Sequence, residues 1–154
     1  MSVTIGSEQL LVISVPGRPV PGGSKKAFAH AKTGRIIVTD DAKGNRDWKA
    51  RVASFAAHGM DGVPPFTCPI EVEVEFRVER PKGHYGTGGN ASSVKPSAPR
   101  WPTTRPDATK LWRAVEDACN GIVWKDDSQV VRQHVSKVYC DRPGVRVVVR
   151  RVDP

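Results

Sequence analysis

The chain has 154 residues, carries 24 Lys and Arg against 16 Asp and Glu, and has a formal net charge of +8 at pH 7. This length suits a single domain, residues 1–154, with a sizeable core. The charge favours a polyanionic partner, nucleic acid before an anionic membrane, although a basic surface that only aids solubility would leave the same excess. No run of about 18 apolar residues is present, so neither a membrane-spanning helix nor a membrane partner is expected.

The N-terminus and the cysteines point to the cytoplasm. Residues 1–17 lack a basic segment ahead of their apolar stretch, so we expect no secretory signal peptide. Cys68, Cys119 and Cys140 are widely spaced and lack the CxxC or Cys/His pairing of a zinc site. Such cysteines are expected to be reduced and mostly buried.

Apolar runs and turn residues predict the elements of the first half of the chain. Residues 8–17 form a short apolar run closed by Pro-Gly, which is typical of a buried strand. Residues 27–40 predict a hairpin that turns at Thr33 and Gly34. Residues 45–59 place apolar side chains at helical spacing and predict a helix.

Strict alternation marks residues 70–80, IEVEVEFRVER, as a strand with one apolar face. The Glu71, Glu73 and Glu75 row reads as its solvent face, although these carboxylates could also reach a nearby site. Residues 130–140 and 144–152 predict two closing strands joined as a hairpin. Helices that alternate with strands predict an α/β fold, with two main helices packed on a mixed β-sheet.

Residues 80–105 form an irregular stretch rich in Gly, Pro and Ser. A loop of about 25 residues is unusual in a compact domain, and it is often functional or disordered. It suits contact with nucleic acid, and it equally suits a mobile surface insertion. Among its basic and aromatic residues are Lys82, His84, Tyr85, Lys95, Arg100, Trp101 and Arg105.

The segment RPDATKLWRAVEDACNGIVWKDDSQVV, residues 105–131, carries the most chemistry. Residues 108–120 predict an amphipathic helix that Asp107 can cap. A short strand, residues 122–124, and a bend at Asp126 and Asp127 should follow. The core face of the helix comprises Leu111, Val115, Ala118 and Cys119. The opposite face comprises Thr109, Arg113, Glu116 and Asn120.

This arrangement suggests a metal site. If the bend returns toward the start of the helix, Asp107 and Asp127 converge, and carboxylates held close together repel unless a cation separates them. Oxygen ligands favour Mg²⁺ or Mn²⁺, which can bind a phosphate oxygen and activate water for phosphodiester cleavage. Arg113 could stabilise charge on that phosphate.

Each of these residues also has an ordinary structural explanation. Asp107 alone can be a helix cap, and Asp126 with Asp127 can be a plain turn. Arg113 with Glu116 and Asp117 can be a solvated helix face held by pairs four residues apart.

The pattern RPD, then xxKLxRAVxDAxNG, then VWKDDSQVV resembles the RusA-type Holliday junction resolvases of phages and prophages. The similarity is strong over residues 105–137, and VPGRPVPGG with the 80–105 loop is similar to members from actinobacterial phages. The resemblance implies a homodimeric, Mg²⁺-dependent endodeoxyribonuclease that binds four-way junctions and nicks two opposed strands in recombination, repair or phage DNA processing. It would act in the cytoplasm of a bacterium or a phage-infected host.

By position, the resemblance makes Asp107 the first catalytic aspartate and Asp127 the late one, with Asp126 as its partner. Arg113 stands where a catalytic lysine is common. One departure is Thr109, where the family usually has a second aspartate, followed by Lys110 instead of Asn. Metal affinity is then weaker, or Glu116, Asp117 or Asp126 supplies the missing charge, or catalysis is lost.

The resemblance and the positive charge together indicate which basic residues contact DNA. The rival from another class is a catalytically silent protein of the same fold that binds branched DNA. An RNA-binding module is a weaker rival, because the chain lacks an aromatic RNP pattern. The expected DNA contacts are Arg18, Lys25, Lys26, Lys82, Arg105, Lys110, Lys125 and Lys137.

Overall fold

A computed structural model describes residues 11–23, 25–40 and 43–153, with only the backbone for residues 25, 26, 39 and 40. A four-stranded sheet has the order β1-β6-β4-β5, and β2 and β3 form a separate two-stranded sheet. The predicted α/β fold, a mixed sheet with two main helices, is confirmed. The strands are β1 (Leu11–Pro16), β2 (Lys25–Ala29), β3 (Ile36–Asp40), β4 (Ile70–Val78), β5 (Val130–Tyr139) and β6 (Gly144–Arg151), and the helices are α1 (Asn45–Met60) and α2 (Ala108–Cys119).

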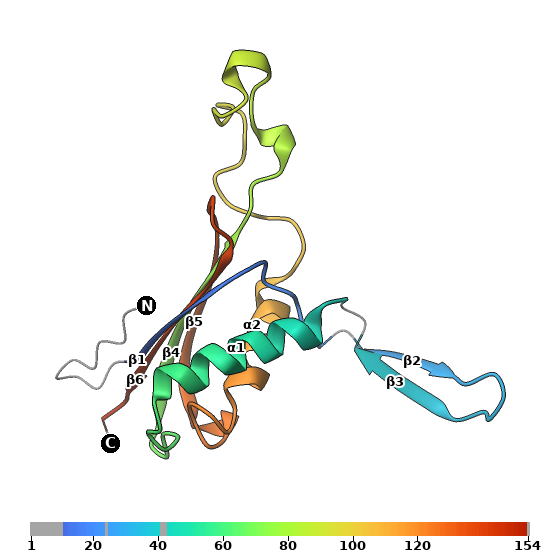
Figure 1. The fold of residues 1–154 in the computed structure, drawn as a ribbon, viewed down its shortest axis with the longest axis vertical. Helices are drawn as coiled ribbons and strands as arrows, with labels where there is room; N and C mark the ends of the chain where they lie inside the picture. The colour runs from blue at the N-terminus through green and yellow to red at the C-terminus, as the bar shows by residue number, and fades with distance from the viewer. Residues whose placement is uncertain (1–10, 24, 41–42, 154) are drawn as a thin grey trace.

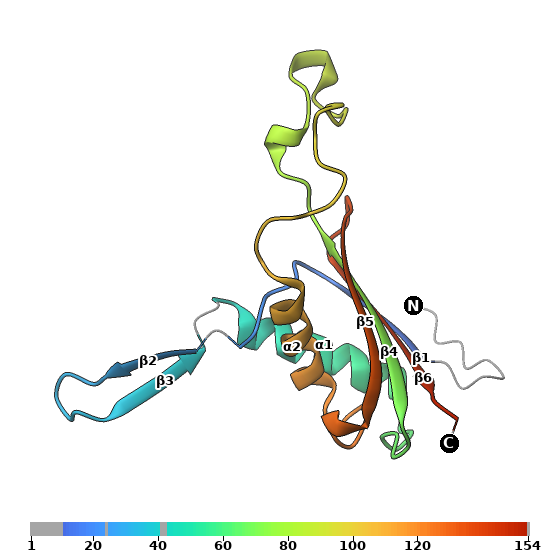
Figure 2. The same cartoon turned by 180° about the vertical axis from the view of Figure 1, so that it is seen from behind.

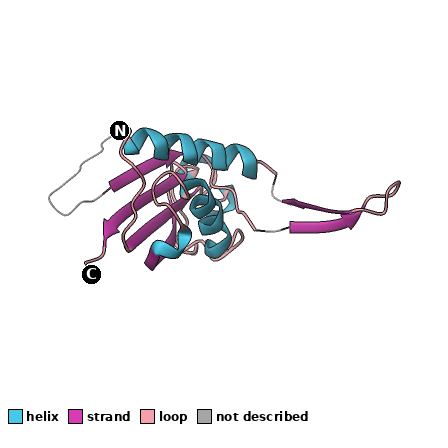
Figure 3. Cartoon of the chain, turned by 90° about the horizontal axis from the view of Figure 1, so that it is seen from below, coloured by secondary structure: helices cyan, strands magenta, loops and turns pink. Residues whose placement is uncertain are grey.

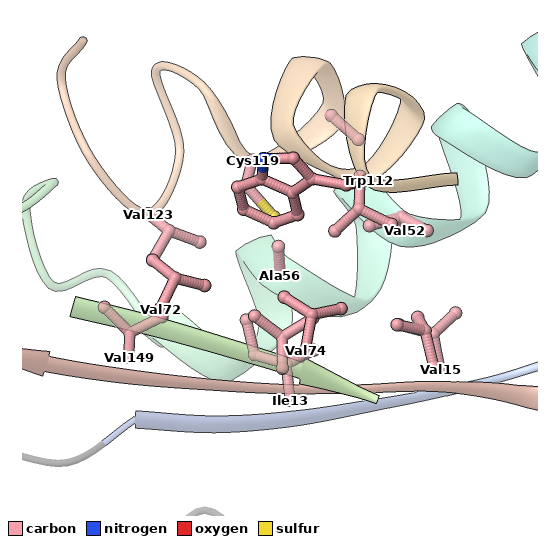
Figure 4. Packing of buried hydrophobic residues seen from close by; sticks show 14 of the residues in the cluster. Ile13, Val15, Val52, Ala56, Val72, Val74, Trp112, Cys119, Val123 and Val149 are labelled. Carbon is pink, nitrogen blue, oxygen red and sulfur yellow. The ribbon is translucent and has the colours of Figure 1, made fainter. Parts of the chain in front are cut away.

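Both helices lie on one side of the large sheet (Figures 1 and 3). The alternation that predicted β4 puts Ile70, Val72, Val74 and Phe76 on that side, all with 0% exposure. Figure 4 shows how side chains of both helices and of the sheet meet there. The core is therefore a single layer between the sheet and the two helices.

The predicted hairpin of residues 130–140 and 144–152 is wrong. β4 lies between β5 and β6, parallel to β5 and antiparallel to β6. Neighbouring strands are about 4.8 Å apart, so a connection across β4 must span roughly 10 Å. Residues 140–143 can bridge that distance, since an extended chain advances about 3.3 Å per residue. Adjacency in sequence therefore did not imply pairing here.

The other predicted elements differ only in detail. The two predicted helices are confirmed as α1 and α2, and the 27–40 hairpin as β2 and β3. Of the first predicted strand, residues 8–10 lie outside the described part of the chain. The predicted strand at residues 122–124 is wrong, because Gly121, at φ 80°, begins a turn in which its N–H donates to the carbonyl of Trp124 at 2.7 Å.

Two segments extend from the body in different directions (Figures 1 and 2). One is the β2–β3 hairpin. The other is the 80–105 loop, which contains two short 3-10 helices, η1 (Lys82–His84) and η2 (Gly88–Asn90), and a β-bridge between Tyr85 and Val94. The three cysteines are unpaired, with Cys119 buried and the other two half-buried. No helix among the described residues is long and apolar enough to cross a membrane.

Gly144 gives a test of the strand order, because it lies between Pro16 of β1 and Arg77 of β4. A Cβ atom added there would stand 2.5 Å from the Val15 carbonyl oxygen. We expect Gly144→Ala to lower the free energy of unfolding by about 1–3 kcal/mol, as overpacking does. Urea denaturation measures this. Gly83→Ala is the matched control, because an added Cβ there meets no atom within 4 Å. Equal stability of the two variants would contradict the close packing of β1 on β6.

Candidate functional site

The segment before the hairpin is docked on α2 through two glycines. The Gly22 N–H donates to the Lys110 carbonyl at 2.8 Å. A Cβ on Gly22 would lie 3.2 Å from the Ala114 nitrogen, so the two backbones touch. At Gly23, with φ 82°, a Cβ would stand 2.9 Å from Cδ of Arg113, so the Arg113 side chain lies over this glycine. The docking brings residues 18–23 beside the N-terminal half of α2.

A cavity of about 620 Å³ opens where this segment meets α2. Four cationic residues surround a single carboxylate, that of Asp107. Electrostatically, the cavity is suited to an anion beside that carboxylate. The lining residues are Arg18, Pro19, Val20, Pro21, Lys43, Arg105, Pro106, Asp107 and Lys110.

A second cavity of about 410 Å³ adjoins the first and shares Arg18, Pro19, Arg105 and Pro106 with it. We call the two together the basic groove. Its second half is also lined by Val78, Glu79, Arg80, Pro81, Lys82, Pro102, Thr104, Lys137 and Tyr139.

The groove gathers most of the basic residues that the sequence named as DNA contacts. These are Arg18, Lys82, Arg105, Lys110 and Lys137. Lys125 is exposed outside the groove lining, and the side chains of Lys25 and Lys26 lie outside the described part of the structure.

Sequence reasoning missed Lys43 and Arg80. Lys43 lies two residues before the predicted helix, and Arg80 ends the alternating strand, so neither stood out from its element. The sequence signal that could have singled out Arg80 is the proline that follows it, because an Arg-Pro pair there marks the end of the strand and the start of the loop.

Lys137 also holds the chain that leads to Asp107. Its ammonium group donates to the carbonyls of Thr104 and Pro106, both at 2.9 Å. Lys137 lies beside Phe76 in the β4–β5 register, so its side chain leaves the sheet on the side of the helices. It therefore positions the backbone that delivers Asp107 to the groove.

Asp107 occupies the N-cap position of α2, but its side chain makes no capping hydrogen bond. Its carboxylate is 60% exposed and stands 4.0 Å from the Lys110 ammonium. The helix-cap explanation therefore accounts for the position of Asp107 but not for an interaction of its carboxylate. That carboxylate faces the groove lining instead.

Asp126 does what the turn explanation expected. It caps the 3-10 helix η3 (Asp127–Gln129), accepting from the Ser128 N–H at 2.8 Å, while its own N–H donates to the Gln129 side chain at 2.8 Å. The hydrogen bonds from Ser128 lower the pKa of Asp126. Asp126 is thus committed to local structure.

Asp127 is oriented by a buried indole. Trp124 has 0% exposure, and its Nε1–H donates to Oδ1 of Asp127 at 2.7 Å. The pKa of Cys119 is raised to about 12, chiefly by burial and further by the negative charge of Asp127. Asp127 therefore lies near the C-terminal end of α2.

Glu116 shares this end of the helix with Asp127. Burial raises the pKa of Glu116, the charges of Asp127 and Asp117 raise it further, and Arg113 lowers it. Asp117 is paired with Lys49 of α1 at 2.8 Å. Glu116 and Asp127 are thus two carboxylates that repel each other, with Arg113 as the cation that offsets part of the repulsion.

The described residues contain no group of three or more His, Cys, Asp or Glu side chains able to hold a metal ion, so Asp107, Asp126 and Asp127 do not form a three-carboxylate site. The convergence of Asp107 with Asp127 alone stays a prediction. At about 1.5 Å per residue, Asp107 and Glu116 are roughly 13 Å apart along the helix. Asp127 is held by Trp124, whose ring lies 6.3 Å from that of Trp112 on α2. Mg²⁺ often binds only one or two carboxylates, together with water and phosphate oxygens.

The cap at Asp126 has a pH signature. A lowered pKa means that the folded state holds the charged form more tightly than the unfolded state, so its stabilisation is complete above the usual pKa of 3.8 and is lost as pH falls through the lower folded value. We expect Asp126→Ala to lower the unfolding midpoint at pH 7, with a difference from wild type that shrinks in acid. Thermal unfolding from pH 7 to 2 measures it. The control is Asp126→Asn, which keeps a hydrogen-bond acceptor but has no carboxyl group to titrate. If the difference in unfolding midpoint between Asp126→Ala and wild type did not change with pH, the assignment would be contradicted.

Comparison with known proteins completes the description of this site. The family model "Endodeoxyribonuclease RusA" matches residues 16–150, which include both ends of α2 and the whole basic groove. The chain is also 33% identical over 143 residues to the uncharacterized protein YqaN of Bacillus subtilis (strain 168), covering 90% of this chain and 94% of the relative. The chain therefore belongs to the RusA family of endodeoxyribonucleases.

Proposed function

We propose that the protein is a structure-selective endodeoxyribonuclease that resolves four-way DNA junctions by paired nicks, with Mg²⁺ or Mn²⁺ as cofactor. The family match over residues 16–150 carries this proposal. The basic groove beside Asp107 supports it. The role would be DNA recombination, repair or phage DNA processing in the cytoplasm.

The groove is the proposed DNA path. Arg18 and Arg105 line both of its halves and would bind phosphates from two directions. Lys82 and Lys110 extend the positive field to either side. Because such contacts release counterions, binding should weaken steeply as salt rises.

The acidic end of α2 is the proposed metal-binding end. Asp127 and Glu116 would hold the cation there, which supplies an activated water and neutralises charge on the scissile phosphate. Arg113, between this pair and Gly23, would bind a phosphate oxygen. It stays protonated and so does not act as the base. Asp107, at the groove end, would orient the DNA from the opposite side.

A homodimer is the proposed active form. Two symmetry-related nicks in opposed strands require two active sites, and a two-fold dimer supplies them in matching orientation. Each subunit would contribute one basic groove to the junction.

A catalytically silent protein that binds branched DNA is the alternative. Thr109 favours it, because a hydroxyl is a poorer Mg²⁺ ligand than the aspartate usual at that position. The absence of a group of three ligands from the described residues favours it as well. Such a protein would bind the junction with or without Mg²⁺ and leave every strand intact.

A strand-nicking assay on a labelled four-way junction separates the two functions. We expect paired, metal-dependent nicks near the branch point and none on a matched linear duplex. Asp127→Asn should abolish nicking and leave junction binding largely unchanged, because the amide keeps the shape and loses the charge. Asp141→Asn, an exposed aspartate in the β5–β6 connection, is the control. Tight binding with no nicks in either metal would favour the silent binder.

Metal binding is tested without activity. Adding Mg²⁺ should raise the unfolding midpoint of the wild-type protein, by an amount that grows with the Mg²⁺ concentration, because the ion binds the folded state. Glu116→Gln and Asp127→Asn should lose most of this shift, whereas Asp117→Asn, whose parent residue is paired with Lys49, should keep it. A shift that survives both of the first two substitutions would place the metal elsewhere.

A further inference from the structure

Trp101 is the one tryptophan of this chain that lies in solvent. It is 53% exposed, whereas Trp48, Trp112 and Trp124 are exposed by 4%, 3% and 0%. Tryptophan is usually highly buried, because its large apolar surface gains most from leaving water. Exposure alone would prove little, since single apolar residues on a surface are common. The anchored backbone and the basic residues around Trp101 indicate that its exposure serves binding.

The backbone on both sides of Trp101 is held in place. Before it, the Pro99 carbonyl accepts a hydrogen bond from Arg80 at 2.7 Å, and that guanidinium lies 4.2 Å from the centre of the Tyr139 ring. After it, Lys137 binds the Thr104 carbonyl at 2.9 Å. The indole is thus presented from an anchored segment, so a ligand that stacks on it would pay little ordering entropy.

The charged residues of the loop that carries Trp101 are all basic, and the nearest acidic residues in sequence, Glu79 and Asp107, line the groove. Residues 80–106 contain Arg80, Lys82, Lys95, Arg100 and Arg105, and no Asp or Glu. A protein partner usually meets a surface of mixed charge, whereas an acid-free segment of this kind suits a polyanion.

Trp101 is also coupled to the groove and to a cation. The next residue, Pro102, is buried and lines the second half of the basic groove. The Arg100 guanidinium lies 5.2 Å from the centre of the Trp101 ring. An aromatic ring with an arginine over it, next to the basic groove, is the combination that suits an unpaired base and its phosphate backbone.

We propose that Trp101, with Arg100, is a stacking site for an unpaired nucleobase of the DNA that occupies the basic groove. The ring takes the base, and Arg100 takes the adjacent phosphate. This rests on the proposed function in one respect, since it requires DNA as the ligand. It adds a reason for preferring branched DNA, because bases at a branch point leave the stack at lower cost than bases within a duplex.

The first probe is a short, fluorescently labelled oligodeoxythymidine, which presents unpaired bases whether or not the protein recognises junctions. Anisotropy titration of the full chain should show Trp101→Ala binding about tenfold more weakly, since a stacked base contributes on the order of 1.4 kcal/mol at that fold-change. Trp101→Phe should retain most of the affinity. Val94→Ala, an equally exposed apolar residue of the same loop at 46%, should bind like wild type.

The second probe is a four-way junction with 2-aminopurine at the branch point. The change in its fluorescence on binding should be lost in Trp101→Ala and kept in Val94→Ala. Unchanged oligonucleotide affinity in Trp101→Ala would overturn the proposal, as would a wild-type protein that does not bind the oligonucleotide. Equal losses in Trp101→Ala and Trp101→Phe would also overturn it, because stacking tolerates phenylalanine. A change of sedimentation mass in Trp101→Ala with unchanged oligonucleotide affinity would identify a protein contact instead.

The nicking assay distinguishes failure of this site from failure of the proposed function. If the wild-type protein binds the oligonucleotide through Trp101 but never nicks a junction, the stacking site stands and the proposed nuclease function fails. If Trp101→Ala nicks junctions as well as wild type and binds the oligonucleotide equally tightly, the proposed function stands and the stacking site fails.

Discussion

The burial of one face of β4 is the constraint on which the remaining structure depends. Ile70, Val72, Val74 and Phe76 have no exposed surface, and such burial is the main favourable contribution to folding. β4 must therefore lie under both helices and inside the sheet. The parallel pairing of β5 to β4 then requires a crossover, and α2 provides it. The position of α2, and of every candidate residue on it, follows from the core.

The opposite face of β4 contributes differently. Glu71, Glu73 and Glu75 pair with arginines of this face, as in the 3.1 Å contact between Glu73 and Arg150. These side chains are one-third to two-thirds exposed, so each pair adds little stability. They keep an acidic row neutral on a protein that needs its positive surface elsewhere. The basic groove lies apart from these pairs, and there Arg18 and Arg105 line the same cavity as Asp107.

Local patterns predicted the parts of this structure that depend on local interactions. The alternation in residues 70–80 and the helical spacing in residues 45–59 each reflect one buried face, so β4 and α1 were predicted correctly. The β5–β6 pairing was predicted wrongly, because the competition between β4 and β6 for β5 is not encoded in the turn that joins the two strands.

The candidate site was predictable only in part, for the same reason. Asp107 and Asp127 were recognisable from their motif, whereas the orientation of Asp127 depends on the buried Trp124 that donates to it. The groove joins Arg18 to Lys137 across most of the chain. No local stretch of sequence could reveal that the Lys137 ammonium group donates to the carbonyls of Thr104 and Pro106.

The strand order also bears on how the chain folds during synthesis. β6, the C-terminal strand, lies between β1, the N-terminal strand, and β4. Within the described structure, β6 is the neighbour to which β1 is hydrogen-bonded. On the ribosome, β1 must therefore wait, with its apolar side chains uncovered by the sheet, until residues 144–151 have emerged. Folding of the sheet is thus a late event, and a nascent chain arrested before β6 would expose the edges of both β1 and β4 to chaperones and to other chains.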